Sequence, residues 1–206
     1  KKRLAARPLC GDRDPYTDGV MDGVEGYLHV TDAKETIGRC YSKSELKSSF
    51  MEAGMERVQF FSVLSDLKNP VFLYADGYFP NEDVSTRIFP TYGYPRSVFM
   101  EEACLHKTFV KEGIFHELCN AYFIDYSMKG EFSHVLQVTG SMERGKKDAL
   151  ITIIRDDKKV EKRAAYPEGQ KRIEELATHD AMLQARGIQV VGGELIDGAY
   201  IMPFME

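Results

Sequence analysis

The clearest helical pattern in the chain is short. Ser42 and Glu45 have the spacing of a capping box, in which each side chain accepts a hydrogen bond from the other residue's backbone N–H. Leu46 and Phe50 follow at helical spacing. The pattern therefore predicts one amphipathic helix over residues 43–53.

After this helix the period of the hydrophobic positions changes to two, which is typical of strands. Residues 58–63 and 71–74 are predicted to be two strands, and the polar segment 65–70 forms the turn between them. A helix is predicted over about 98–112. Residues 115–126 are apolar enough for either a strand or a second helix, and the pattern leaves the two alternatives open.

From His134 onward the pattern predicts three strands, then a helix, and then two strands joined by a tight turn. The β-branched run at 149–154 and the run at 160–165 are separated by a polar turn. Residues 169–186 have helical spacing, and Asp197-Gly198 is a strong signal for a hairpin turn.

Composition limits the class of protein. The 206 residues are 43% hydrophobic and 29% charged, which is typical of a folded protein, and a shift near Gly130 predicts two domains, 1–131 and 132–206. The net charge of −5 argues against a nucleic-acid partner. No apolar run approaches the roughly 20 residues of a membrane span. Four cysteines without metal-ligand spacing favour a reduced, cytoplasmic protein, and no histidine pattern indicates a metal site.

Residues 8–27 are rich in Gly, Asp and aromatic residues, and a loop of this length usually has a function. The motifs of this loop and of the segments after it are GDRDPYTDG (11–19), DGVEGY (22–27), YSKSEL (41–46), EAGM (52–55), FFSVLSD (60–66) and YFPNE (78–82). With these motifs, residues 8–125 resemble the C-terminal half of a family of bacterial class I S-adenosylmethionine-dependent methyltransferases associated with polysaccharide gene clusters.

The resemblance implies an α/β fold, in which part of a doubly wound sheet ends in an antiparallel strand pair. It also implies S-adenosylmethionine as the cofactor of the parent protein and a small-molecule or glycan acceptor. The methyl donor of such a fold binds at a GxG turn, and no GxG occurs in the chain. Since the chain also begins without Met, we expect a fragment whose donor-binding half lies upstream of Lys1 and which is inactive alone.

Residues 132–206 resemble the small lobe of protein-kinase-like and aminoglycoside-kinase-like folds, an α+β arrangement. The resemblance places Lys162 where such folds keep a nucleotide-binding lysine, with Glu174 or Glu175 as its helix partner. The turn at 143–148 is not a glycine-rich phosphate loop, and the HRD and DFG motifs are absent. ATP is therefore a weaker expectation than the methyl donor.

The preferred candidates for substrate binding lie in the long loop, and no catalytic residue is assigned. Carboxylates and hydroxyls in one Gly-rich loop can bind sugar hydroxyls or act as a general base, but Asp-Pro and Asp-Gly are equally good turn formers. His116 is either an acid–base residue or a packed histidine. The loop candidates are Asp14, Tyr16, Thr17, Asp18 and Glu25.

Three functional hypotheses follow. The first is that the parent protein methylates a glycan or glycolipid intermediate, and that this chain supplies part of the acceptor side. The second makes the rear domain a nucleotide-binding or phosphotransferase module. The third is non-catalytic, with the chain serving as a scaffold or as a contact of a homodimer.

Overall fold

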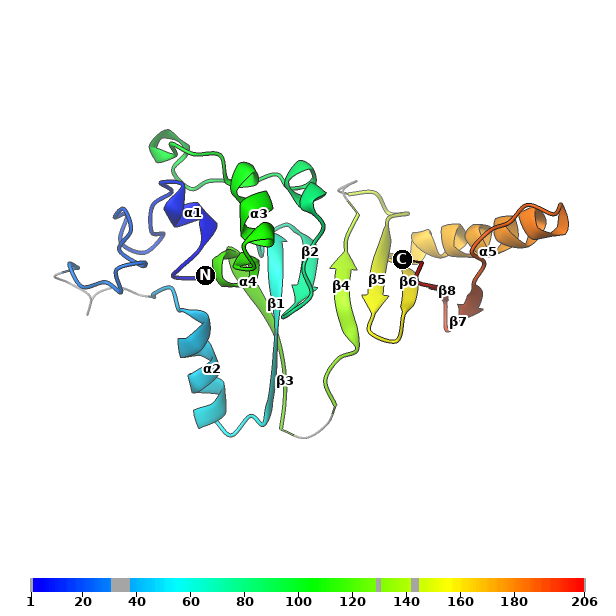
Figure 1. The fold of residues 1–206 in the computed structure, drawn as a ribbon, viewed down its shortest axis with the longest axis horizontal. Helices are drawn as coiled ribbons and strands as arrows, with labels where there is room; N and C mark the ends of the chain where they lie inside the picture. The colour runs from blue at the N-terminus through cyan, green and yellow to red at the C-terminus, as the bar shows by residue number, and fades with distance from the viewer. Residues whose placement is uncertain (1, 31–37, 129–130, 142–144, 206) are drawn as a thin grey trace. The chain divides into compact units, whose positions relative to one another are not determined.

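The computed structural model of the protein describes residues 2–30, 38–128, 131–141 and 145–205. The chain divides into two compact units, Lys1–Ser133 (unit 1) and His134–Glu206 (unit 2) (Figure 1). The sequence places the boundary at 131, and Gly130 beside it lies outside the described residues. Both units combine helices with strands, so the protein is of the mixed α/β type.

The described residues of unit 1 are built around three antiparallel strands in the order β3-β1-β2. The strands are β1 (Arg57–Ser65), β2 (Pro70–Ala75) and β3 (Ala121–Ser127). The helices are α1 (Ala6–Leu9), α2 (Lys43–Glu52), α3 (Glu102–Lys111) and α4 (Phe115–Leu118), with 3-10 turns η1 (Glu82–Arg87) and η2 (Pro95–Ser97).

The predicted capped helix is confirmed as α2. The Ser42 hydroxyl accepts a hydrogen bond from the Glu45 backbone N–H at 3.2 Å, and the Glu45 carboxylate accepts one from the Ser42 N–H at 2.7 Å. The two bonds satisfy donors that the first turn of a helix otherwise leaves free. The helix ends at Glu52, one residue before the predicted end.

The antiparallel strand pair is also confirmed, as β1 and β2. The ambiguous segment 115–126 contains both alternatives, because α4 is followed directly by β3. The helix predicted from residue 98 begins only at Glu102. A long-range contact explains the late start, since the backbone N–H of Phe99 donates to the carbonyl of Cys10 at 3.0 Å and holds this residue against the first loop.

The hydrophobic core of unit 1 lies where β1 and β2 meet α3 and α4. Leu64, Phe72 and Phe115 are at most 1% exposed, and the rings of Tyr74 and Phe115 meet edge to face with centroids 5.7 Å apart. Phe109 adds a further aromatic side chain from α3. Burial of this apolar surface fixes α3 and α4 on the strands, and with them the polar side chains at the N-terminus of α3.

In the described part of unit 2, five antiparallel strands lie in the order β4-β5-β6-β8-β7. Its elements are β4 (Val135–Thr139), β5 (Leu150–Arg155), β6 (Lys159–Ala164), η3 (Pro167–Gly169), α5 (Gln170–Ala185), β7 (Glu194–Ile196) and β8 (Ala199–Pro203). This is the predicted order of elements.

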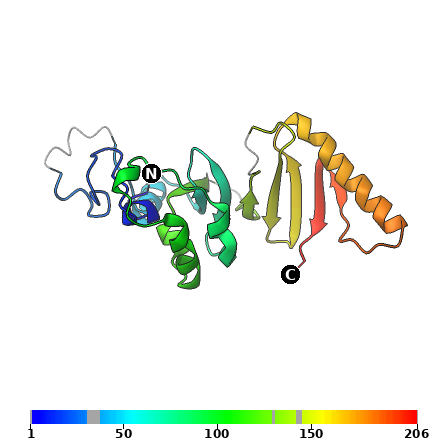
Figure 2. The ribbon, with the colours of Figure 1, turned by 90° about the horizontal axis from the view of Figure 1, so that it is seen from above.

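Two features shape unit 2. Asp197 and Gly198 both have positive φ, 48° and 74°, which is the geometry of the hairpin turn that their sequence predicts. Helix α5 contacts β6, β7 and β8, and it lies across one side of these strands (Figure 2). It is anchored by Ile173, which is completely buried.

The strand pairings within each unit are antiparallel. The parallel part of a doubly wound sheet and the kinase-like identity of unit 2 therefore stay predictions. No helix among the described residues has both the length and the apolar character needed to cross a membrane.

Candidate functional site

The main cavity of unit 1 has a volume of about 430 Å³ and lies where two irregular segments meet the end of β1. One wall comes from the first 23 residues, and the opposite wall comes from Thr91, Tyr92 and Gly93. Residues from the turn after β1 and the start of β3 complete the lining, among them Asp66 and Asn120. The cavity is therefore assembled from segments that are far apart in the sequence.

Asp66 organises the turn between β1 and β2 at the edge of the cavity. Its Oδ1 accepts hydrogen bonds from the backbone N–H groups of Lys68 (2.8 Å) and Asn69 (2.9 Å). Its Oδ2 accepts from the Thr91 hydroxyl (3.0 Å) and the Arg7 guanidinium (3.1 Å). Burial acts to raise the pKa of Asp66, but these donors outweigh it, so the pKa lies below its usual value and the carboxylate is ionised at neutral pH.

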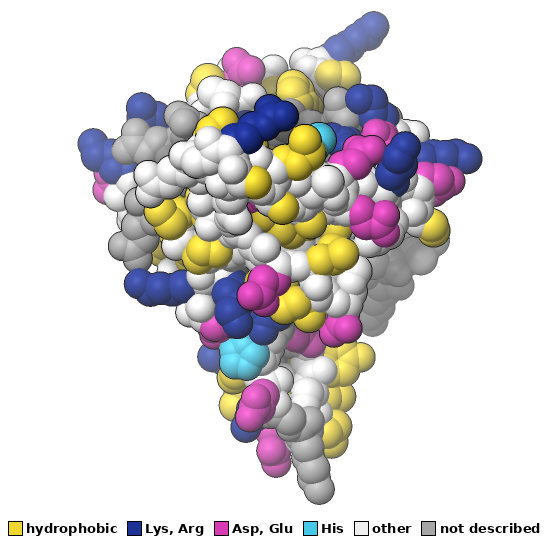
Figure 3. All heavy atoms as spheres, turned by 90° about the vertical axis from the view of Figure 1, so that its right-hand side faces the viewer, with side chains coloured by type: hydrophobic (Ala, Val, Ile, Leu, Met, Phe, Trp, Pro, Cys, Tyr) yellow, Lys and Arg dark blue, Asp and Glu magenta, His cyan; other side chains and the backbone are white. Residues whose placement is uncertain are grey.

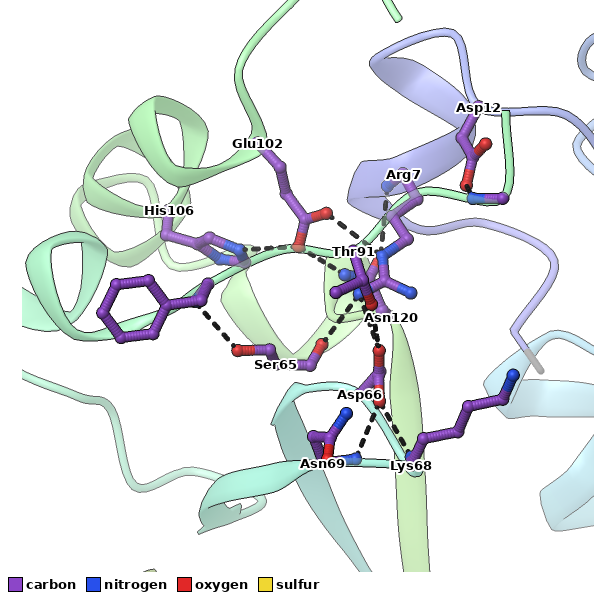
Figure 4. A network of polar contacts seen from close by, with 12 residues as sticks. Arg7, Asp12, Ser65, Asp66, Lys68, Asn69, Thr91, Glu102, His106 and Asn120 are labelled. Carbon is purple, nitrogen blue, oxygen red and sulfur yellow. Dashed lines mark hydrogen bonds and ion pairs between the residues drawn. The ribbon is translucent and has the colours of Figure 1, made fainter. Parts of the chain in front are cut away.

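Arg7 links this turn to a second carboxylate, that of Glu102 at the start of α3 (Figure 4). Glu102 is completely buried. Its Oε2 lies 3.3 Å from Arg7 Nε, and its Oε1 accepts from the Asn120 side chain and lies 3.4 Å from His106 Nε2. The backbone N–H of Arg7 in turn donates to Asn120 Oδ1 at 3.0 Å. Arg7, Asp66, Glu102, His106 and Asn120 form one connected polar cluster, here called the Arg7 network.

Asp12 fastens the two walls of the cavity to each other. Its carboxylate accepts hydrogen bonds from the backbone N–H groups of Gly93 (3.2 Å) and Tyr94 (2.8 Å), more than 80 positions along the chain. The Tyr94 hydroxyl donates to Asp18 on the exposed side of the same loop. We call this set of contacts between residues 12–18 and 93–94 the clasp.

Asp14 has the geometry of a turn-forming residue. Its Oδ1 accepts from the backbone N–H groups of Tyr16 (2.9 Å) and Thr17 (3.3 Å), and its Oδ2 accepts from the Tyr27 hydroxyl (3.0 Å). The side chain is buried at the cavity wall. Both carboxylate oxygens are therefore already occupied by donors of the loop itself.

The other loop candidates do not converge on the cavity. Tyr16 is 43% exposed, the Thr17 hydroxyl accepts from the Gly19 N–H, and Asp18 contacts Tyr94. Glu25 lies 3.6 Å from His29 on the surface. Of the five residues proposed from the sequence, only Asp14 lines the cavity.

The cavity lining carries more basic than acidic side chains, and two of the basic ones, Arg13 and Lys68, have no carboxylate partner among the described residues. The described lining includes Lys2, Arg3, Arg7, Arg13 and Lys68 against Asp12, Asp14 and Asp66. The three aspartates each accept at least two hydrogen bonds from the protein. Lys68 is exposed and makes no hydrogen bond or ion pair with a described residue through its ammonium, and in Figure 4 its side chain extends away from the network.

This cation excess is local. Figure 3 shows another face of the molecule, the right-hand side of Figure 1, where basic, acidic and hydrophobic side chains are interspersed. The whole chain is acidic, with a net charge of −5. The cations of the cavity therefore favour an anionic ligand at this part of a chain that is acidic overall.

His116 belongs to a second buried polar cluster, which includes Ser62 of β1 and Lys2. Its Nδ1 lies 2.8 Å from the Ser62 hydroxyl and 3.8 Å from Asp76 Oδ1. A nucleophilic triad needs one ring nitrogen for the serine and the other for the carboxylate, so this arrangement is not a triad. The Lys2 ammonium is also buried here and donates to the backbone carbonyls of His116 and Glu117. Burial lowers the pKa of His116 and that of Lys2.

Lys162 of unit 2 lies opposite Thr152 and Tyr200 in the sheet. Opposed residues share a face, and the Tyr200 hydroxyl donates to Asp180 of α5, so Lys162 lies on the face that α5 covers. Glu174 is exposed, and no ion pair joins it to Lys162 in the described parts of the chain. Part of the turn at 143–148, residues 143 and 144, lies outside the described residues.

A metal site is not apparent in the described ranges, where no group of three or more His, Cys, Asp or Glu side chains is placed to hold an ion. All four cysteines are free, and three are buried, whereas Cys104 is exposed.

The comparisons with known proteins return no match to a family, to a curated protein or to a solved structure.

Proposed function

We propose that unit 1 forms the acceptor-binding side of an S-adenosylmethionine-dependent methyltransferase, and that its acceptor is a small molecule or glycan with an anionic group. The observation that carries this proposal is the cavity between the first loop and residues 91–93, in which the carboxylates are occupied, whereas Arg13 and Lys68 have no carboxylate partner among the described residues. The ordered motifs of residues 8–125 supply the reaction class.

The occupied carboxylates support an acceptor that carries negative charge. Asp12, Asp14 and Asp66 are each below 10% exposed and already accept hydrogen bonds from the protein, so they have little capacity to bind additional hydroxyls. Lys68 and Arg13 carry charges that no carboxylate among the described residues neutralises. A carboxylate or phosphate of the ligand would supply the missing negative charge.

An anionic acceptor also fits the lack of a free general base. A hydroxyl acceptor needs a group that removes its proton during methyl transfer, whereas a carboxylate or phosphate oxygen is ionised at neutral pH. In this proposal the Arg7 network holds Asp66 and the turn after β1 in place, and Lys68 and Arg13 orient the acceptor. The methyl donor binds to residues of a longer protein outside these 206 positions.

Calorimetric titration of the 206-residue chain tests the acceptor side. We expect heat of binding with glucuronate or glucose 1-phosphate, none with glucose, and weaker binding of the two anions in Lys68→Gln. S-adenosylmethionine alone is expected to give no heat with this chain. Equal binding of glucose and the two anions would contradict the anionic acceptor.

The reaction class is tested separately on a longer protein that carries a GxG turn. With methyl-labelled S-adenosylmethionine we expect label in an anionic acceptor and competition by the demethylated donor product. Absence of donor binding by that protein would remove the methyltransferase proposal, even if the cavity binds anions.

A second proposal concerns unit 2 alone. Lys162 lies on the face covered by α5, which is the observation that favours a nucleotide-binding module. Thermal denaturation tests it: ATP with magnesium is expected to raise the melting temperature of the chain, and Lys162→Ala is expected to abolish the increase. Identical melting with and without ATP would exclude this second function.

A further inference from the structure

A second hollow of about 390 Å³ borders the main cavity and shares Arg13 and Gly93 with it. The rest of its described lining is Tyr94, Pro95, Arg96 and Ser97. Arg13 and Gly93 therefore form a common boundary, and a ligand that fills the first cavity can continue past Arg13 into the second.

The second hollow is lined by two arginines and by no acidic residue in the described part of the chain. Arg96 is exposed and makes no ion pair with a described residue. Arg13 donates to the backbone carbonyl of Asp18 at 2.9 Å, which leaves its charge without a carboxylate partner. Guanidinium groups present paired donors that match carboxylates and phosphates, so this hollow also favours an anion.

The clasp fixes the distance between the two hollows. Asp12 holds the backbone N–H groups of Gly93 and Tyr94, and the Ser97 hydroxyl donates to the Tyr94 carbonyl at 2.8 Å. The boundary between the hollows is thus tied to the first loop by side-chain hydrogen bonds. A preorganised boundary favours ligands with one fixed spacing between their charges.

We propose that the two hollows are consecutive subsites for a linear acceptor that carries anionic groups, carboxylate or phosphate, on neighbouring units. The terminal unit lies beside Lys68 in the main cavity, and the next unit lies on Arg13 and Arg96. This inference rests on the proposed function, because the first subsite is the acceptor site argued above.

Chain-length dependence of binding tests the inference. The 206-residue chain is titrated with galacturonate and trigalacturonate as the carboxylate arm, with inorganic phosphate and triphosphate as the phosphate arm, and with glucose and maltotriose as neutral controls. In at least one anionic arm we expect the longer probe to bind about tenfold more tightly than the single unit. The arm that shows the gain identifies the kind of anion.

Variants test whether the gain in affinity with probe length comes from the second hollow. In Arg96→Ala we expect the affinity ratio of long to short probe to fall toward one, whereas the matched control Arg186→Ala, an exposed arginine at the end of α5, is expected to keep the wild-type ratio. Circular dichroism checks that both variants are folded. No gain in either anionic arm, an equal gain with maltotriose, or a ratio unchanged by Arg96→Ala would overturn the inference.

The same titrations separate this inference from the proposed function. Binding of the single anionic units without any gain from length would remove only the second subsite. Failure of the single anionic units to bind would instead contradict the acceptor cavity itself.

Discussion

Arg7 Nε lies 3.3 Å from the carboxylate of Glu102, whose side chain is completely buried at the first turn of α3. A buried charge without a partner is strongly destabilising, whereas removal of both charges costs much less. The Arg7–Glu102 pair therefore couples the stability of α1 to that of α3.

Arg7→Met is expected to lower the free energy of unfolding by about 3–5 kcal/mol, because it leaves Glu102 buried and unpaired. The double variant Arg7→Met/Glu102→Gln is expected to lose less than the sum of the two single variants. Urea denaturation measures all three. The control is Arg172→Met, which removes an exposed ion pair to Asp148 and should cost below about 1 kcal/mol. Equal losses for Arg7→Met and the control would contradict the role of Arg7.

The sequence predicted the parts of unit 1 that depend on neighbouring residues. The capping box before α2 and the turn between β1 and β2 involve residues at most a few positions apart, so their patterns are visible in the chain. The Arg7 network joins Arg7 to Asn120, 113 positions away, and no local pattern records such a pairing. The sequence predicted the turn that contains Ser65 and Asp66, but it did not indicate that Arg7 pairs with Asp66.

For the candidate site too, local patterns in the sequence indicate a loop but do not indicate its contacts with distant segments. A function for the first loop was predicted from its composition and stays a prediction, while the structure shows that residues of this loop line the cavity. The charge of the cavity could not be predicted, because it depends on which carboxylates are occupied by donors from distant segments, such as the Gly93 N–H on Asp12. Glu102 was not identified from the sequence, because one acidic residue within the predicted helix 98–112 does not indicate a buried arginine partner.

Ser42→Ala is expected to destabilise α2 by about 1 kcal/mol, since it removes the acceptor of the Glu45 N–H. Hydrogen exchange of the amides in the first turn of α2 measures the effect and should accelerate. The matched variant Ser48→Ala changes an exposed serine inside the same helix and is expected to be neutral or slightly stabilising. Similar exchange in both variants would show that the capping box contributes little.

Asp12→Ala is expected to open the clasp. Hydrogen bonds to a charged acceptor contribute about 1.5–3 kcal/mol, so the amides of Gly93 and Tyr94 should exchange at least about tenfold faster. Asp12→Asn keeps one acceptor oxygen and is expected to give an intermediate rate. Exchange measured by NMR or mass spectrometry should leave α5 in unit 2 unchanged. Unaltered exchange at residues 93 and 94 would contradict the clasp.

Stability should fall on acidification because of His116. Burial holds the pKa of its imidazole below the usual 6.5, so below that pH the unfolded chain binds a proton that the folded chain excludes. The stabilising effect is fully present above pH 6.5 and is lost as the pH falls toward the folded pKa, with a slope of up to about 1.4 kcal/mol per pH unit. Urea midpoints between about pH 7.5 and about pH 5.5 measure it.

The chain contains four other histidines, so the contribution of His116 is measured as a difference between two proteins. His116→Asn keeps a side-chain group that can bond the Ser62 hydroxyl and removes the titration. Its stability is expected to depend less steeply on pH than that of the wild type. Parallel curves for the two proteins would contradict the assignment.

The complete burial of Glu102 has an evolutionary consequence. Loss of Arg7 alone exposes the protein to the full cost of an unpaired interior charge, so the two positions are constrained to change together. In homologues aligned to this chain, we expect an uncharged residue at position 102 to accompany loss of the arginine at position 7. The pair would then be inherited as one unit, although 95 positions separate its members.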